Sequence, residues 1–139
     1  MAGKILLEVV TPDKLLVSQQ VDEVIAPGSE GEFGVLPGHC HFLSTLRIGE
    51  LRYRIGDQTS HMAVFWGYAE VTPTKVTIMA EIAEKAEDID VERAQATFVK
   101  AEERLKAGGL PSEVKEAEIS LEKARLRKKI AERARTTAL

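Results

Sequence analysis

The residue pattern and composition of the sequence change near Glu84. This change limits the chain to folds that contain two different kinds of segment. Before it, apolar and polar residues alternate over short runs interrupted by Gly and Pro, as in residues 51–55. Such alternation is typical of strands with one buried face. From Ile89 to the end the alternation stops, and Ala, Glu, Lys and Arg dominate. The sequence therefore predicts an α+β fold by segregation, with strands first and helices last.

Residues 1–87 are predicted to form an all-β sandwich. Short strands at regular spacing, separated by Gly and Pro turns, indicate a sandwich or a barrel. Gly56 and Asp57 are expected to form a hairpin turn, and Gly67 a bulge within a long apolar run. The expected strands are residues 5–10, 21–25, 33–36, 42–46, 51–55, 62–71 and 76–79.

Residues 88–139 are predicted to form an antiparallel hairpin of two helices. Asp88 or Asp90 is expected to cap the first helix. Its apolar positions recur at spacings of three and four, which is the pattern of one buried stripe. These positions are Val91, Ala94, Phe98, Ala101 and Leu105. Gly108 and Gly109 are expected to end this helix, and the next begins within residues 110–112.

The second helix carries two apolar stripes, whereas a simple hairpin needs only one. A small-residue stripe suits close packing on the first helix and comprises Val114, Ala117, Leu121, Ala124, Ala131 and Ala134. Ile119, Leu126 and Ile130 lie roughly opposite, by the 3.6-residue period. The second stripe requires another surface. The β segment and another protein are both open as that surface.

Composition excludes several functional classes. The net charge of −3 and the pI of about 5.7 argue against a dedicated nucleic-acid binder. One cysteine excludes an internal disulfide and fits a reducing compartment. Apolar runs fall short of the roughly 18 residues expected of a membrane span, and the N-terminus lacks signal-peptide features. His39, Cys40 and His41 offer too few ligands for a structural zinc site, even with His61.

Charge is distributed unevenly along the chain. Residues 121–139 hold seven basic residues against two acidic ones, and residues 1–87 hold seven basic against twelve acidic. A basic helix of this kind is commonly a solvated face. It also suits an anion or an acidic partner surface, with binding that weakens in salt.

A turn-rich stretch, residues 27–52, holds five of the ten glycines and the acidic pair Glu30 and Glu32. It does not contain a phosphate-binding GxxxxGK[ST] motif, and a helical pattern does not follow it. Exposed turn carboxylates are far commoner than acid–base pairs. Because loops carry function more often than the strands that hold them, this stretch is a candidate contact surface.

The segment EKAEDIDVERA, residues 84–94, has a different character. Asp90 near a helix start can cap that helix, but N–H groups at a helix start also suit an anion. Arg93 lies on the same helix, and Lys100, Lys123 and Arg127 add positive charge if the hairpin folds over. Helix caps are common, so chemistry alone does not single out a nucleotide site here.

Three stretches carry a resemblance to a known family: VTPDKLLVSQQVDEVIAPGSEGEFGVLPGH, GYAEVTPTKVTIMAE and AEDIDVERA. They resemble the epsilon subunit of bacterial F-type ATP synthases, which is called delta in mitochondria. The similarity spans almost the whole chain, and GSEGEFGVLPGH is its most specific part. The resemblance implies a β-sandwich of about ten strands in residues 1–87 and a regulatory helical hairpin in residues 88–139.

The same resemblance implies a set of partners. The chain would be a non-catalytic subunit of the central stalk, bound to gamma and touching the membrane ring of c subunits. Its hairpin would extend toward the catalytic alpha/beta head and inhibit ATP hydrolysis. The implied location is the cytoplasmic face of the bacterial plasma membrane, peripheral and without insertion. Residues near the ring would be Ser29, Glu30, Gly31, Glu32 and His39.

The resemblance also implies a regulatory ATP site, with no cofactor required. Some members bind ATP through an I-D-x-x-R-A motif, which is intact here. The implied residues are Glu84, Ile89, Asp90, Arg93, Ala94, Lys100, Lys123 and Arg127. Lys100 and Lys123 stand where tight-binding relatives carry arginine, so we expect weaker binding. The alternative function is a free-standing ATP-sensing module.

Overall fold

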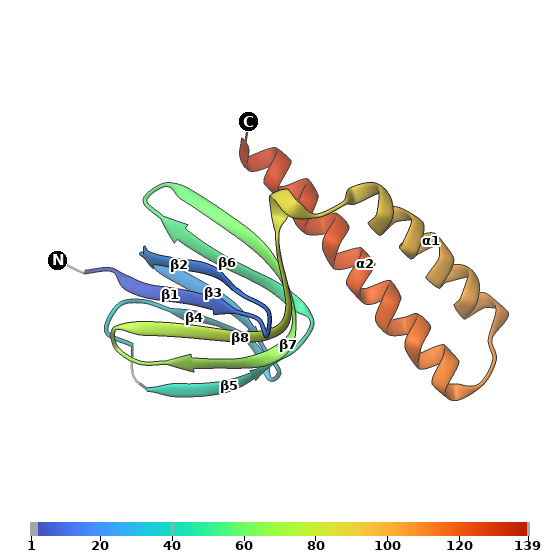
Figure 1. The fold of residues 1–139 in the computed structure, drawn as a ribbon, viewed down its shortest axis with the longest axis horizontal. Coiled ribbons are helices and arrows are strands. Elements are labelled where there is room, and N and C mark those ends of the chain that lie inside the picture. The colour runs from blue at the N-terminus through green and yellow to red at the C-terminus, as the bar shows by residue number, and fades with distance from the viewer. Residues whose placement is uncertain (1–2, 40, 139) are drawn as a thin grey trace. The chain divides into compact units, whose positions relative to one another are not determined.

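The computed structural model describes residues 3–39 and 41–138, with side chains described as far as residue 133. The chain divides into two compact units, Met1–Lys85 and Ala86–Leu139. The first unit holds the strands and the second holds the helices (Figure 1). The predicted order, a β-sandwich followed by a two-helix hairpin, is confirmed. Cys40 and the side chain of Ala134 lie outside the described part.

The described residues of the first unit form eight strands, where the resemblance implied about ten. Two of the strands are long, with 14 residues in β7 and 11 in β8. The strands are β1 (Ile5–Val10), β2 (Leu15–Val21), β3 (Glu23–Gly28), β4 (Gly31–Val35), β5 (Phe42–Leu46), β6 (Gly49–Ile55), β7 (Gln58–Val71) and β8 (Lys75–Lys85).

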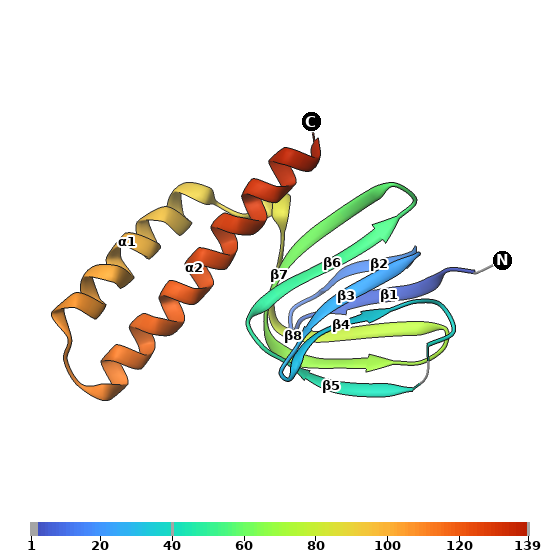
Figure 2. The same ribbon diagram turned by 180° about the vertical axis from the view of Figure 1, so that it is seen from behind.

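The strands form one continuous sheet that closes over a single core. Its order is β2-β1-β8-β7-β5-β3-β4, and β6 pairs with both β3 and β7. Strand β7 therefore has two partners on one side: β6 along its first half and β5 along its second half. Figure 2 shows this from behind, with β5 next to β7. The parallel pairing of β1 with β8 is the exception in an otherwise antiparallel sheet.

Alternation along the strands fills the core, as the sequence predicted. Ile5, Leu7 and Val9 of β1 are fully buried, while the residues between them are half-buried. The same buried cluster includes Leu51 of β6 and Ile78 of β8. Burying an aliphatic side chain of this size contributes about 1.5–3 kcal/mol, so these alternating positions are the main source of the stability of the sandwich.

Two expectations about the strands were wrong. Residues 15–21 form β2, which the sequence analysis missed because most of its side chains are exposed and its apolar residues do not alternate. Gly67 does not form a bulge: the pairing of β7 with β8 keeps one register from Met62 to Val71. Instead the ladder is interrupted at Trp66, which has a φ of 56°, and Gly67 follows with a φ of 140°.

The second unit begins with a short 3-10 helix, η1 (Ala86–Asp88), followed by α1 (Val91–Ala107) and α2 (Pro111–Ala138). Asp90 is the N-cap of α1 and Gly108 its C-cap, with a φ of 73°. Pro111 begins α2, a position where its missing N–H is no loss. The predicted helix boundaries are confirmed.

The two helices pack through their small residues, as predicted. The buried alanines are Ala94, Ala101, Ala117, Ala124 and Ala131. Phe98 is half-buried, and the ammonium of Lys128 lies 4.5 Å from the centre of its ring. On the second stripe, Ile119 and Leu126 are half-buried, whereas Ile130 is fully buried. The partner of this second stripe stays a prediction.

Gly67 offers a direct test of the β7–β8 approach. A Cβ there would collide with the carbonyl oxygen of Met79 and lie 2.8 Å from Cα of Ala80. We expect Gly67→Ala to lower the free energy of unfolding by about 3 kcal/mol or more, measured by denaturant titration. Gly34→Ala is the control, because a Cβ there meets nothing within 4 Å. Equal stability of the two variants would contradict the packing described.

Asp22 gives the stability of the sandwich a dependence on pH. Its carboxylate accepts the N–H of Gly56 at 2.7 Å and the Lys4 ammonium at 2.9 Å. The Gly56 hydrogen bond, together with that of Lys4, holds the pKa of Asp22 below its ordinary value of 3.8. A depressed pKa in the folded state means that the ionised form stabilises the fold above about pH 4, and this contribution disappears as pH falls through the folded pKa.

We therefore expect Asp22→Asn to be less stable than the natural chain at neutral pH and to approach it in acid. Denaturant titrations between pH 7 and pH 2.5 measure the difference in the free energy of unfolding. A difference that stays constant over this range would show that the Asp22 carboxylate does not titrate differently in the folded and unfolded states.

Candidate functional site

The turn between β3 and β4 is held rigidly by its neighbours. Ser29 donates its backbone N–H to the carbonyl of Thr45 at 2.9 Å, and its hydroxyl accepts from the Thr45 hydroxyl at 2.7 Å. Arg47 donates from Nε to the carbonyl of Gly28 at 3.2 Å. Gly31 closes the turn with a φ of 136°, which favours glycine. Ser29 and Glu30 are exposed to solvent in this turn, and Thr45 of β5 holds the turn in place.

Glu32 extends the acidic character of this turn along β4. It is paired with Pro27 of β3 in the sheet, and its carboxylate accepts from Nη2 of Arg52 at 3.1 Å. Its side chain remains 46% exposed. Glu32 can therefore accept further hydrogen bonds from a partner while one of its oxygens is held.

His39 joins the same surface through aromatic contacts. Its ring lies edge-on to Phe42 of β5, with centroids 6.3 Å apart, and Phe42 lies edge-on to Phe33 of β4 at 5.0 Å. An open groove of about 430 Å³ runs along this surface. It is lined by Glu30, Gly31, Glu32, Phe33, Phe42, Leu43, Ser44 and Thr45. The structure thus brings the five turn residues predicted from the sequence to one surface, which we call the turn edge.

Behind the turn edge lies a chain of charged groups that the sequence analysis missed. Arg52 donates from Nη1 to the buried carboxylate of Glu50 at 3.0 Å, in addition to its bond with Glu32. The other oxygen of Glu50 lies 3.1 Å from Nδ1 of His61. The alternation of Glu50 and Arg52 on β6 puts both on one face, but only the sheet topology brings Glu32 to them.

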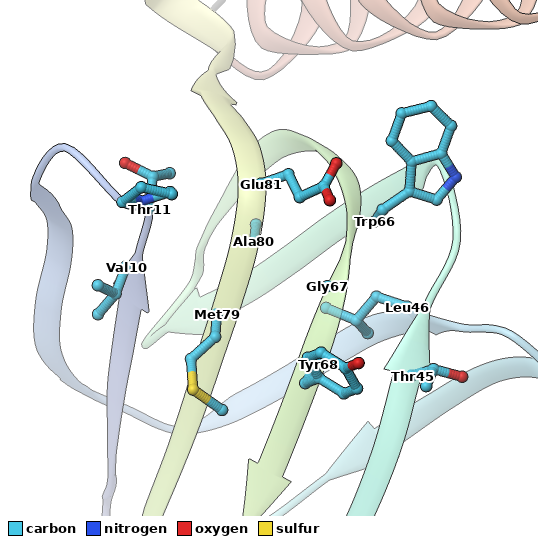
Figure 3. A pocket seen from close by; sticks show the side chains of 11 residues that line it. Val10, Thr11, Thr45, Leu46, Trp66, Gly67, Tyr68, Met79, Ala80 and Glu81 are labelled. Atoms are coloured by element: carbon cyan, nitrogen blue, oxygen red, sulfur yellow. The ribbon is translucent and has the colours of Figure 1, made fainter.

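A second surface of the sandwich is apolar and also escaped the sequence analysis. An open pocket of about 540 Å³ lies over β5, β7 and β8. Figure 3 shows Tyr68 and Met79 side by side on the paired strands β7 and β8, with Trp66 higher in the view. Tyr68 is 55% exposed and Met79 42% exposed. Exposed apolar groups gathered in this way mark interaction surfaces.

Trp66 is unusual among the residues of this pocket. Within the described residues it is the one non-glycine side chain at positive φ, which costs about 1 kcal/mol for an ordinary residue. Backbone strain of this kind concentrates at functional positions. Trp66 directly precedes Gly67, whose backbone lies too close to β8 for any side chain. The strained φ of Trp66 therefore lies next to the close approach of β7 and β8.

The residues of the predicted ATP site fall in both units. Glu84 lies on β8 in the first unit, paired with Ala63. The other seven lie in the second. Asp90 accepts the backbone N–H of Arg93 at 3.1 Å and leaves the Arg93 side chain exposed. Ala94 is buried and donates its N–H to the carbonyl of Asp90 at 3.0 Å.

Ile89 and the three lysine and arginine residues complete this group. Ile89 precedes the cap and donates its N–H to the carbonyl of Ala86 at 3.3 Å. Lys123 and Arg127 are one turn apart on α2 and half-buried, while Lys100 is exposed on α1. Phe98 lies level with Lys128, and Arg104 lies level with Glu116. Arg127 therefore faces the second turn of α1, and Lys123 faces the middle of that helix. Of the four cations in this group, Arg93 alone lies in the first turn of α1.

Within the described residues, groups of three or more His, Cys, Asp or Glu side chains suited to holding a metal ion were not found. Likewise, the described helices include none long and apolar enough to cross a membrane. Cys40, which stands between His39 and His41, lies outside the described residues.

Two family models match the chain and together cover nearly all of it. Residues 4–86 match the β-sandwich domain of the ATP synthase delta/epsilon chain. Residues 87–135 match the long α-helix domain of the same chain. The two matches meet within the η1 segment, close to the division between the two compact units.

Curated relatives are similar over almost their full length. The ATP synthase epsilon chain of Syntrophobacter fumaroxidans is 53% identical over 133 residues, covering 96% of this chain and 99% of that protein. The epsilon chain of Geobacter metallireducens is 49% identical over 134 residues, covering 94% and 96%.

Solved structures agree with these relatives. A chain in the cryo-EM structure of the Euglena gracilis mitochondrial ATP synthase (OSCP/F1/c-ring) matches with a TM-score of 0.80 and 25% identity, over 96% of this chain and 82% of that one. A chain in the central stalk/c-ring structure of Tetrahymena thermophila matches with a TM-score of 0.59 at 14% identity, which supports the fold alone.

Proposed function

The chain belongs to the ATP synthase delta/epsilon family, and we propose that it works as a non-catalytic, regulatory subunit of the central stalk. The sandwich couples the stalk to the membrane ring, and the hairpin controls ATP hydrolysis. The observation that carries this proposal is the full-length match to epsilon chains together with the two-unit structure. The turn edge and the apolar pocket supply two contact surfaces on one sandwich, and these surfaces meet at Thr45.

The two surfaces of the sandwich suit two different partners. We assign the apolar pocket around Tyr68 and Met79 to gamma, because a permanent partner within a rotor favours an apolar interface. We assign the turn edge to the polar loops of the c ring, because it presents carboxylates and His39 beside the exposed ring of Phe42. A subunit bound in this way lies at the cytoplasmic face of the bacterial plasma membrane without entering the bilayer.

The hairpin has the features of an element with two docking surfaces. Its small residues lie between α1 and α2. On the second stripe Ile130 is already buried, whereas Ile119 and Leu126 keep part of their apolar surface exposed. The basic end of α2 suits an acidic surface such as the catalytic head. In one state the hairpin rests, and in the other it extends toward the alpha/beta head and stops rotation.

Regulatory ATP would favour the resting state by binding at the start of α1. Asp90 already accepts the Arg93 N–H, so the first turn of α1 offers a carboxylate to the ligand as well as N–H groups. A carboxylate suits the hydroxyl or amino donors of a nucleoside. Arg93 supplies positive charge for phosphates at the start of α1, and Arg127 and Lys123 supply it farther along the hairpin. Lysine at positions 100 and 123 lacks the planar fork of arginine, which favours weak binding.

Removal of the hairpin tests the regulatory role. We expect the assembled enzyme carrying residues 1–87 of this chain to hydrolyse ATP at least about twofold faster than the enzyme with the full chain, if half the complexes hold the hairpin extended. The buried cluster of the sandwich lies wholly within these residues, so the coupling unit should remain folded. ATP hydrolysis is measured at matched subunit stoichiometry. Unchanged hydrolysis would refute an inhibitory hairpin.

Arg93 tests the ATP site separately. We expect ATP to bind the full chain with saturation at millimolar concentration, and Arg93→Gln to weaken binding about tenfold by removing a charged contact. The cap should survive, because Asp90 bonds the backbone of Arg93 rather than its side chain. Arg104→Gln is the matched control, since Arg104 lies on the same helix and pairs with Glu116 at 3.5 Å. Calorimetric titration lacking saturation at millimolar ATP would contradict the site.

A further inference from the structure

A chain of four charged or titratable side chains crosses four strands behind the turn edge. Glu32 stands on β4, Arg52 and Glu50 on β6, and His61 on β7. Strand β3 lies between β4 and β6, with Ile25 paired to Arg52 and Pro27 paired to Glu32. The outermost member, Glu32, is a turn-edge residue, whereas Glu50 is buried and the side chain of His61 is only 10% exposed. The chain therefore connects a surface carboxylate to the interior.

The geometry of the sheet requires a long, forked side chain at position 52. Strands two apart are separated by about 9–10 Å, so a side chain on β6 must pass over β3 to reach β4. Arg52 does so and places Nη2 at 3.1 Å from Glu32, while Nη1 stays 3.0 Å from Glu50. A lysine carries one compact charge and lacks the planar fork that separates two such contacts.

Glu50 fixes the direction of the Arg52 guanidinium from the inside. One of its oxygens accepts from Arg52 and the other lies 3.1 Å from Nδ1 of His61. The side chains of Glu50 and His61 are only 5% and 10% exposed, so neither can turn away into water. Desolvation works to lower the pKa of Arg52, but the hydrogen bond to Glu50 and the charges of Glu32 and Glu50 raise it overall.

We propose that Arg52 is a positioning residue for the ring contact of Glu32, anchored by Glu50 and His61. This inference rests on the proposed function, in which Glu32 meets the c ring. Arg52 holds one oxygen of Glu32, so the other is presented in a fixed direction to a hydrogen-bond donor on the ring loop. Fixing a flexible carboxylate before docking lowers the conformational entropy that is lost on binding.

A mutant cycle on the full chain bound to gamma tests the proposal. The variants are Glu32→Gln, Arg52→Gln and the double variant, and the measurement is the dissociation constant of each gamma complex for purified c ring in nanodiscs. We expect each single variant to weaken binding about three- to tenfold. We expect the double variant to be no weaker than Glu32→Gln alone, because Arg52 acts through Glu32.

Two further variants separate positioning from stability. Arg54→Gln removes the same charge two residues along β6, where Arg54 lies 3.9 Å from Asp22 and 3.7 Å from Glu23, and should leave ring binding unchanged. Arg52→Lys keeps a positive charge beside Glu50 but cannot hold both carboxylates. It should therefore weaken ring binding with little change in the melting temperature, which keeps the test valid if Arg52→Gln does not fold.

The outcomes distinguish the positioning role of Arg52 from the ring contact of Glu32. Weakened binding by Glu32→Gln with unchanged binding by both Arg52 variants would overturn the positioning role and leave the ring contact intact. Unchanged binding by Glu32→Gln would overturn the ring contact itself, and the positioning role with it. Losses at Glu32 and Arg52 that multiply in the double variant would mean that Arg52 acts independently of Glu32, which also overturns the proposal.

Discussion

The close approach of β7 and β8 at Gly67 is the constraint on which the sandwich depends. Strand β7 must leave β6 and join β5 partway along its length while it keeps one register with β8. Glycine permits this because its backbone can lie against the Met79 carbonyl with no side chain between them. The positive φ of Trp66 belongs to the same local distortion. One change of partner along one strand thus closes the sheet over its core.

The same distortion shapes the surfaces that the protein offers to partners. Trp66 and Gly67 both line the apolar pocket, and Tyr68 follows directly on the exposed face. The β5 strand that β7 joins also holds the turn edge, through the bonds between Thr45 and Ser29. Both contact surfaces therefore rest on the β5–β7 pairing. This arrangement suits a coupling subunit, because a force applied at one surface is carried to the other by a closely packed sheet.

The hairpin follows different physics. Its helices are joined largely through alanines, which bury little apolar area. Ile130 of α2 is also fully buried, and Lys128 makes a cation–π contact with Phe98. Such an element gains modest stability from its own packing and can exchange one docking surface for another at low cost. Under the proposed function, the packed sheet suits coupling and the helical pair suits control.

The sequence alone determined the features that depend on neighbouring residues. Alternation located most strands, and the spacing of alanines gave the helix interface. Asp90, Gly108 and Pro111 marked the helix ends, because periodicity and capping are local properties.

The tertiary structure alone decided the rest. The ion pair of Glu32 with Arg52, the pocket around Tyr68 and Met79, and the interruption at Trp66 each depend on which strands become neighbours. Strand β2 was missed for the same reason, since its pairing with β1, rather than its own composition, makes it a strand. Strand pairing joins residues far apart in the sequence, and local patterns do not record it.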